Sequence, residues 1–197
     1  GKKRKQSLWS SISKNFFYHQ RRKAFWMDKA KPGAAMNPAI FYFATLGTNV
    51  VIDETPVTNL ENESKACSDP VSYGLWWSWK EFGSFPKTTI FCTEGENSSF
   101  QNYEKLKSKF SKAGELAYRP ITAWDIHLNI KSLERYLSEQ FTFIQKNFSN
   151  FFIVLNPTSG TNPMSMAFFY SIFNCLQNAP LERLKLVYIQ EFKKEKT

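Results

Sequence analysis

Runs of apolar and β-branched residues alternate with polar and amphipathic segments along most of the chain. The clearest run, at 151–155, leads into the polar turn 156–161 and then into a helical apolar pattern at 164–176. This order predicts a buried strand, a tight turn and a helix. Shorter runs of the same kind predict further strands at 39–45, 88–93, 115–122 and 184–190.

The segments between these strands complete an alternating pattern. Apolar spacing predicts helices at 99–113 and 128–148, while the aromatic-rich segment 70–82 fits a helix or an irregular segment. Strands that alternate with helices predict an α/β fold with a Rossmann-like, mainly parallel sheet of about five or six strands and helices on both faces. Pro120 lies in the weak run 115–122, which predicts an edge strand.

Two of the predicted strands end in similar small polar loops. In open α/β sheets, ligands bind at the carboxyl ends of strands, and backbone N–H groups at a helix start favour an anion such as phosphate. Hydroxyl groups add donors, and glycine permits close approach of the backbone. An ordinary turn with good capping residues is the alternative. The predicted ligand-binding residues are Gly47, Thr48 and Asn49 in one loop and Thr158, Ser159, Gly160, Thr161 and Asn162 in the other.

The segments Ala-Thr-Leu-Gly-Thr-Asn at 44–49 and Ser-Gly-Thr-Asn-Pro-Met-Ser at 159–165 resemble the two ligand loops of CARF (CRISPR-associated Rossmann fold) domains. Those domains carry a Gly-Thr loop after the first strand and a Gly-Thr-Lys-Pro-Met-like turn after a later one. The resemblance extends over residues 38–192 in the order of elements, but it depends on these two loops. Asn162 stands where many members have Lys, which removes a cation from the expected phosphate site.

The resemblance implies a sensor of a cyclic oligoadenylate second messenger, with cyclic tetra-adenylate as the first choice, in type III CRISPR antiviral defence. It also implies a homodimer or higher oligomer, because a two-fold-symmetric ring can meet the same loops from each subunit. No cofactor, metal or catalytic residue is expected. Slow cleavage of the ring, as in several relatives, is the enzymatic alternative, and Asn162 argues against efficient cleavage.

The positive charge of the chain is concentrated at its start. The 197 residues have a net charge of +9, and residues 1–31 contain ten Lys or Arg and one acid, Asp28. The remaining 16 basic and 16 acidic residues balance, so the globular part is neutral. Apolar spacing at 7–29 predicts a basic amphipathic helix. We therefore divide the chain into 1–31, a juxtamembrane or linker helix, and 32–197, a CARF-like ligand-sensing domain.

A basic, aromatic-rich helix suits an anionic membrane surface. With the CARF resemblance, it looks like the cytosolic part of CARF proteins joined to an N-terminal transmembrane helix, the CRISPR-associated membrane effectors. This implies a full-length protein at the cytoplasmic face of the prokaryotic inner membrane, anchored by a segment outside these 197 residues, which would themselves be soluble. A solvated helix packed on the domain is an equal alternative. A regulator that binds nucleic acid is less favoured, because no helix-turn-helix unit is visible.

Other chemistry in the sequence is sparse. Asp125 and His127 could form an acid–base pair, although an isolated histidine is more often structural. Glu94 and Glu96 could suggest a metal site, yet acids near a helix start are common. The aromatic residues Tyr73, Trp76, Trp77 and Trp79 fit a core or a dimer interface better than stacking on purines. An odd number of cysteines, Cys67, Cys92 and Cys175, fits a reducing cytosol.

Overall fold

The computed structural model of the chain describes residues 37–61, 69–176 and 181–187. The helix predicted at 7–29, the last residues of the strand predicted at 184–190 and Cys67 lie outside these ranges. The division of the chain at residue 31 therefore stays a prediction.

The described residues form one sheet of five parallel strands in the order β3-β2-β1-β4-β5. This order places β1 at the centre and matches a doubly wound Rossmann-like fold, which confirms the predicted fold class. β3 lies at an edge, as Pro120 indicates. The strands are β1 (Ala39–Thr45), β2 (Lys87–Cys92), β3 (Leu116–Pro120), β4 (Phe151–Asn156) and β5 (Leu184–Leu186).

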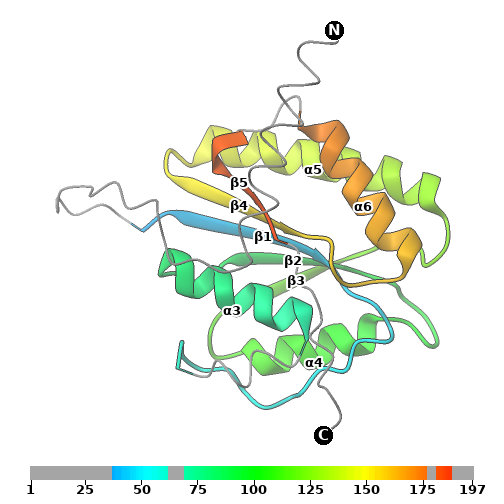
Figure 1. The fold of residues 1–197 in the computed structure, drawn as a ribbon, viewed down its shortest axis with the longest axis horizontal. Coiled ribbons are helices and arrows are strands. Elements are labelled where there is room, and N and C mark those ends of the chain that lie inside the picture. Colours follow the sequence, from blue (N-terminus) through cyan, green and yellow to red (C-terminus); the bar gives the residue numbers. More distant parts are fainter. Residues whose placement is uncertain (1–36, 62–68, 177–180, 188–197) are drawn as a thin grey trace, which may run out of the picture. The chain divides into compact units, whose positions relative to one another are not determined.

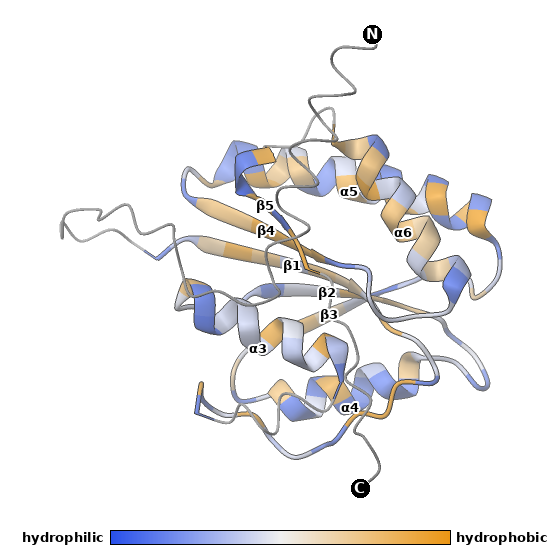
Figure 2. Cartoon of the chain, in the orientation of Figure 1, coloured by the Kyte–Doolittle hydropathy of each residue, from blue (hydrophilic) through white to orange (hydrophobic). Residues whose placement is uncertain are grey.

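Helices cover both faces of the sheet (Figure 1). α3 and α4 lie on one face, and α5 and α6 pack side by side on the other. Figure 2 shows hydrophobic residues along β1 and β4 and helices of mixed hydropathy around them. α6 also exposes the apolar or aromatic side chains of Met166, Phe169 and Tyr170. The helices are α3 (Pro70–Phe82), α4 (Phe100–Phe110), α5 (Ile126–Asn147) and α6 (Asn162–Cys175), and a short 3₁₀ helix, η1 (Leu181–Arg183), precedes β5.

β1 is buried on both faces, as expected for a central parallel strand. Tyr42 and Ala44 belong to the buried cluster that faces α3 and α4. Phe41 and Phe43 point to the opposite face, where the Phe43 ring lies 6.3 Å from the ring of Tyr136 in α5. The alternation explains why the run at 39–45 is continuously apolar rather than alternating with polar residues.

The aromatic residues of α3 belong to the core. Trp76 is 1% exposed, and its Nε1–H donates a hydrogen bond to the Leu60 carbonyl at 3.1 Å. Trp77 and Trp79 are partly buried and pack against the same cluster. The structure thus favours packing over stacking on purines for this segment. In the described part of the chain, no helix combines the length and apolar character needed to cross a membrane.

The connections of β1 and β4 diverge at the centre of the sheet. β1 and β4 are neighbours, but the chain leaves β1 towards α3 on one face and leaves β4 into α6 on the other (Figure 1). The order of strands reverses at this position, and such a switch point is where open α/β sheets bind ligands. The two predicted ligand loops both begin here.

Candidate functional site

The loops after β1 and β4 touch through their backbones. A Cβ atom added to Gly47 would lie 2.9 Å from the Cα of Gly160, which is closer than any side chain could pack. Gly160 has φ +127°, a conformation that residues with a Cβ rarely adopt. Both glycines are therefore required by the geometry of this contact.

Hydrogen bonds from Ser159 join the same two loops. The hydroxyl of Thr45 donates to the Ser159 carbonyl, and the Gly47 N–H donates to the Ser159 Oγ at 3.3 Å. The Ser165 hydroxyl also donates to the Ser159 carbonyl at 3.3 Å. Ser159 is 3% exposed, so its polar atoms serve the contact between the loops.

Asn156, at the end of β4, ties this region to α3. Its side chain is fully buried, and Nδ2 donates to the Tyr42 hydroxyl at 2.7 Å and to the Pro70 carbonyl at 3.1 Å. Its Oδ1 accepts from the Thr158 N–H at 3.0 Å. Burial raises the pKa of Tyr42 far above its usual value, so the hydroxyl remains neutral and donates to the Val71 carbonyl at 3.3 Å.

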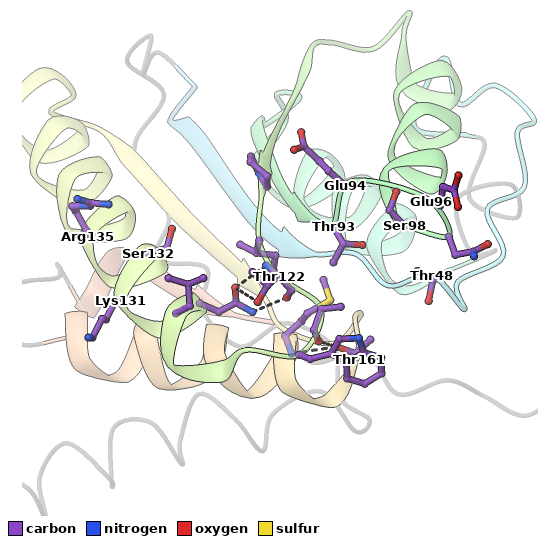
Figure 3. Close-up of a pocket in the computed structure, with 18 residues that line it drawn as sticks. Thr48, Thr93, Glu94, Glu96, Ser98, Thr122, Lys131, Ser132, Arg135 and Thr161 are labelled. Carbon is purple, nitrogen blue, oxygen red and sulfur yellow. Dashed lines mark hydrogen bonds between the residues drawn. The ribbon is translucent and has the colours of Figure 1, made fainter.

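A cavity of about 1150 Å³ opens at the carboxyl edge of the sheet (Figure 3). Thr48 from the loop after β1 and Thr161 and Met164 from the start of α6 contribute to its lining. The remaining walls come from the β2–α4 loop at 93–98, the end of β3 at Pro120, the β3–α5 loop at 121–124 and the first turns of α5. The cavity therefore collects residues that follow four neighbouring strands.

Opposite charges line opposite walls of this cavity. Glu94 and Glu96 extend from the β2–α4 loop, while Lys131 and Arg135 extend from α5 (Figure 3). The four formal charges cancel, so the cavity has a basic side and an acidic side rather than an excess of one sign. Trp124 also lines the cavity and is 77% exposed, which leaves its ring face accessible to a planar group.

Reciprocal hydrogen bonds hold the β2–α4 loop. The Thr93 N–H donates to the Ser99 Oγ at 2.8 Å, and the Ser99 N–H donates to the Thr93 Oγ1 at 2.9 Å. Gly95 and Asn97 take positive φ values of 99° and 54° between them, which lets the chain turn sharply. Contacts within the loop therefore hold this wall of the cavity in shape without a bound ligand.

The β3–α5 loop is held in a similar way. The Thr122 N–H donates to the Asn129 Oδ1 at 2.9 Å, and the Asn129 Nδ2 donates back to the Thr122 carbonyl at 2.8 Å. Thr161 connects this loop to α6, because its hydroxyl donates to the Ala123 carbonyl at 3.0 Å and accepts from the Met164 N–H at 3.5 Å. The hydroxyl proton of Thr161 is therefore already engaged in a hydrogen bond within the protein.

The eight residues predicted to bind ligand lie in one region but play different parts. Thr48 and Thr161 line the cavity, whereas Gly47, Ser159 and Gly160 form the contact between the loops. Asn49 and Asn162 are exposed residues of the same two loops, and Thr158 is half-buried. Their roles in ligand binding stay predictions.

Several cavity residues were not predicted from the sequence. They are Glu94, Glu96, Trp124, Lys131 and Arg135. The sequence suggests the two glutamates as a metal pair or as ordinary acids near a helix start, not as one wall of a cavity. The described residues contain no group of three or more His, Cys, Asp or Glu that could hold a metal ion. A usable signal existed, because the loops after β2 and β3 must end at the same edge as the loops after β1 and β4.

Asp125 and Cys92, two groups with possible chemical roles, instead stabilise the fold. Asp125 caps α5, since its Oδ1 accepts from the Leu128 N–H at 2.8 Å, and His127 is exposed. Burial, with a smaller effect from Glu94, raises the pKa of the buried Cys92 thiol to about 12. Cys92 is thus a neutral, apolar residue of the core at ordinary pH.

No protein-family model matches the chain, and no curated protein is significantly similar to it in sequence. Solved structures are similar to it in fold. Can2 from Sulfobacillus thermosulfidooxidans, in complex with cyclic tetra-adenylate, is 13% identical with a TM-score of 0.45, over 78% of this chain and 33% of that chain. Csm6 from Enterococcus italicus, bound to cyclic hexa-2′-fluoro-hexa-dAMP, is 15% identical with a TM-score of 0.49. The match covers 79% of this chain and 35% of that chain. The chain spans about a third of the length of these two proteins.

Proposed function

We propose that this domain senses a cyclic oligoadenylate, with cyclic tetra-adenylate as the first candidate, in the manner of the CARF domains that its two loops resemble. The observation that carries the proposal is the backbone contact between Gly47 and Gly160. It brings the two Gly-Thr-Asn loops, far apart in sequence, to one point at the switch point of the sheet. A phosphodiester ring presented there meets both loops at once.

The site supplies the groups that such a ligand needs. Backbone amides of the two loops and the start of α6 favour phosphate, and Lys131 and Arg135 add positive charge on the α5 wall. Trp124 offers an exposed aromatic face for a base. The cavity is slightly larger than the roughly 300–1000 Å³ of typical small-molecule sites, which suits a large nucleotide.

In this proposal two copies of the domain bind one ring across a two-fold axis, so each copy presents the same loops to half of the ligand. Binding changes how the two copies sit against each other, and a segment before residue 1 carries this change to a membrane effector in type III CRISPR defence. The basic residues 1–31 support a position next to an anionic membrane surface. Light scattering tests the dimer, because the proposal expects a mass near twice the 23.0 kDa of one chain both before and after cyclic tetra-adenylate is added.

The test of ligand binding is calorimetric titration of the 197-residue chain with cyclic tetra-adenylate, and with linear tetra-adenylate as the comparison. We expect the cyclic ligand to bind and replacement of Arg135 by Ala to weaken binding about tenfold, the loss expected for one charge-assisted hydrogen bond. Lys146→Ala is the matched control, because Lys146 is a cation of the same helix outside the cavity lining. No binding by the unaltered chain at high micromolar concentrations contradicts the proposal.

Cleavage of the ring is a second candidate, which the cations of the cavity favour. Attack of a ribose 2′-hydroxyl on the adjacent phosphate requires alignment and a nearby positive charge. Asn162 does not supply that charge, but Lys131 and Arg135 line the same cavity. Incubation of the chain with cyclic tetra-adenylate, followed by chromatography of the products, distinguishes the two candidates. Linear products formed over many turnovers support the enzyme, and an intact ring after prolonged incubation supports the sensor.

A further inference from the structure

Asn102, in the first turn of α4, holds the loop after β1 from outside the cavity. Its Nδ2 donates to the Gly47 carbonyl at 2.9 Å and to the Thr48 carbonyl at 3.1 Å. Both partners are carbonyl oxygens, which only accept hydrogen bonds, so the orientation of the amide is fixed by chemistry. One side chain therefore sets the direction of two successive peptide groups.

The direction of those carbonyls determines the direction of two amides. In a planar trans peptide the C=O and the N–H point in opposite directions, and the described chain has no cis peptide. Because the Gly47 and Thr48 carbonyls point to α4, the N–H groups of Thr48 and Asn49 point away from it. Within the described residues neither N–H donates a hydrogen bond, whereas the Gly47 N–H is used by Ser159.

We infer that Asn102 is a positioning residue that aims the Thr48 and Asn49 amides at a phosphodiester of the ligand. This deepens the proposed function and rests on it for the ligand. Two adjacent amides with no acceptor in the described chain form a small concave donor pair of the kind that binds anions. Thr48 itself lines the cavity, which places the pair at its edge.

The identity of the residue matters for this role. An aspartate at 102 would place negative oxygen against two carbonyl oxygens and would repel the loop. An alanine would leave the carbonyls without this donor, yet alanine is a better helix former than asparagine, so α4 itself would not be weakened. Loss of function in the alanine variant would therefore report on the loop and not on the helix.

The experiment compares Asn102→Ala and Asn102→Asp with Gln101→Ala, the matched control. Gln101 is an exposed amide side chain of the same helix. Calorimetry measures affinity for cyclic tetra-adenylate, and ¹H–¹⁵N spectra of the free proteins follow the shifts and hydrogen exchange of the Thr48 and Asn49 amides. We expect about tenfold weaker binding for the alanine variant, a greater loss of affinity for the aspartate variant and unchanged affinity for the control. The shifts and hydrogen exchange of the Thr48 and Asn49 amides should change only in the two Asn102 variants.

Each result decides the inference. Altered amides together with weaker binding support it. Unaltered amides overturn it even if binding weakens, and altered amides with unchanged affinity overturn it as well. If the unaltered chain does not bind cyclic tetra-adenylate, the proposed function fails, and inorganic phosphate becomes the probe. Phosphate-dependent shifts of the Thr48 and Asn49 amides that disappear in Asn102→Ala then support the positioning role, and their absence or persistence overturns it.

Discussion

Replacing Gly47 by alanine tests the contact on which the candidate site depends. The added Cβ would lie 2.9 Å from the Cα of Gly160 and 3.1 Å from both its N and C atoms. Carbon atoms in contact prefer roughly 3.5–4.0 Å, so the two loops must separate by about half an ångström or more. The hydrogen bond from the Gly47 N–H to Ser159, already 3.3 Å long, lengthens further as they do.

Two opposing effects set the size of the change. Overpacking of a close backbone contact costs about 1–3 kcal/mol. Replacing glycine by alanine also restricts the unfolded chain, which stabilises the protein by about 0.4–1 kcal/mol where the backbone conformation allows alanine. Gly47 is not among the glycines with positive φ, so its conformation does allow alanine. The net expectation is a loss of about 1–2 kcal/mol, because the steric cost exceeds the entropic gain.

Urea denaturation and thermal unfolding measure this loss. At this chain length, 1–2 kcal/mol corresponds to a fall in Tm of about 2–8 °C. Val51→Ala is the control, because Val51 is 82% exposed and lies shortly after the same loop. Affinity for cyclic tetra-adenylate should fall with stability in Gly47→Ala and remain in the control. A variant as stable as the unaltered chain, or more stable, would refute the idea that the two loops must touch.

Three further predictions concern buried side chains. Asn156→Ala leaves several buried partners without a hydrogen bond and should lower the free energy of unfolding by about 2–4 kcal/mol in urea titrations. The Asp69 carboxylate is 1% exposed and lies 3.9 Å from the Lys109 Nζ. Lys109→Ala removes this buried cation and should lower the free energy of unfolding by about 3–5 kcal/mol. Lys105→Ala, on the exposed face of the same helix, should change the free energy of unfolding by less than about 1 kcal/mol. Similar losses for the two lysines would contradict this. The Cys92 thiol has a pKa of 9.0 before perturbation and about 12 in the fold, so its contribution to stability is complete below pH 9 and declines as the pH rises from 9 towards 12. Cys92→Ala should therefore lose less stability than the unaltered chain between pH 9 and 11, and parallel pH profiles would contradict the shift.

The strands and the edge position of β3 were largely predictable because their signals are local. The runs that became β1 and β4 are continuously apolar, as strands buried on both faces must be, and polar loops bound them. Pro120 marks β3 as an edge strand because proline cannot donate to a ladder. The predicted start of α5 was late by two residues, because the capping carboxylate of Asp125 begins the helix earlier than its apolar spacing suggests.

The candidate site was only partly predictable, because most of it is made by packing. Thr48 and Thr161 carry a local signal, since glycine and hydroxyl residues interrupt apolar runs where strands end. Arg135 carries none, because the packing of α5 against the sheet brings it to the cavity. Asn102 is the strongest case, since its partners lie 54 and 55 residues earlier in the chain. An asparagine in an amphipathic helix gives no indication of a contact at that distance.

The direct contact of Gly47 with Gly160 also constrains how the domain can respond to an occupant. No side chain separates the two turns, and one turn leads towards α3 while the other opens α6 on the opposite side of the sheet. A molecule that wedges against either turn must push on both. That push reaches α4 through the hydrogen bonds of Asn102 and reaches α6 through the turn that opens it.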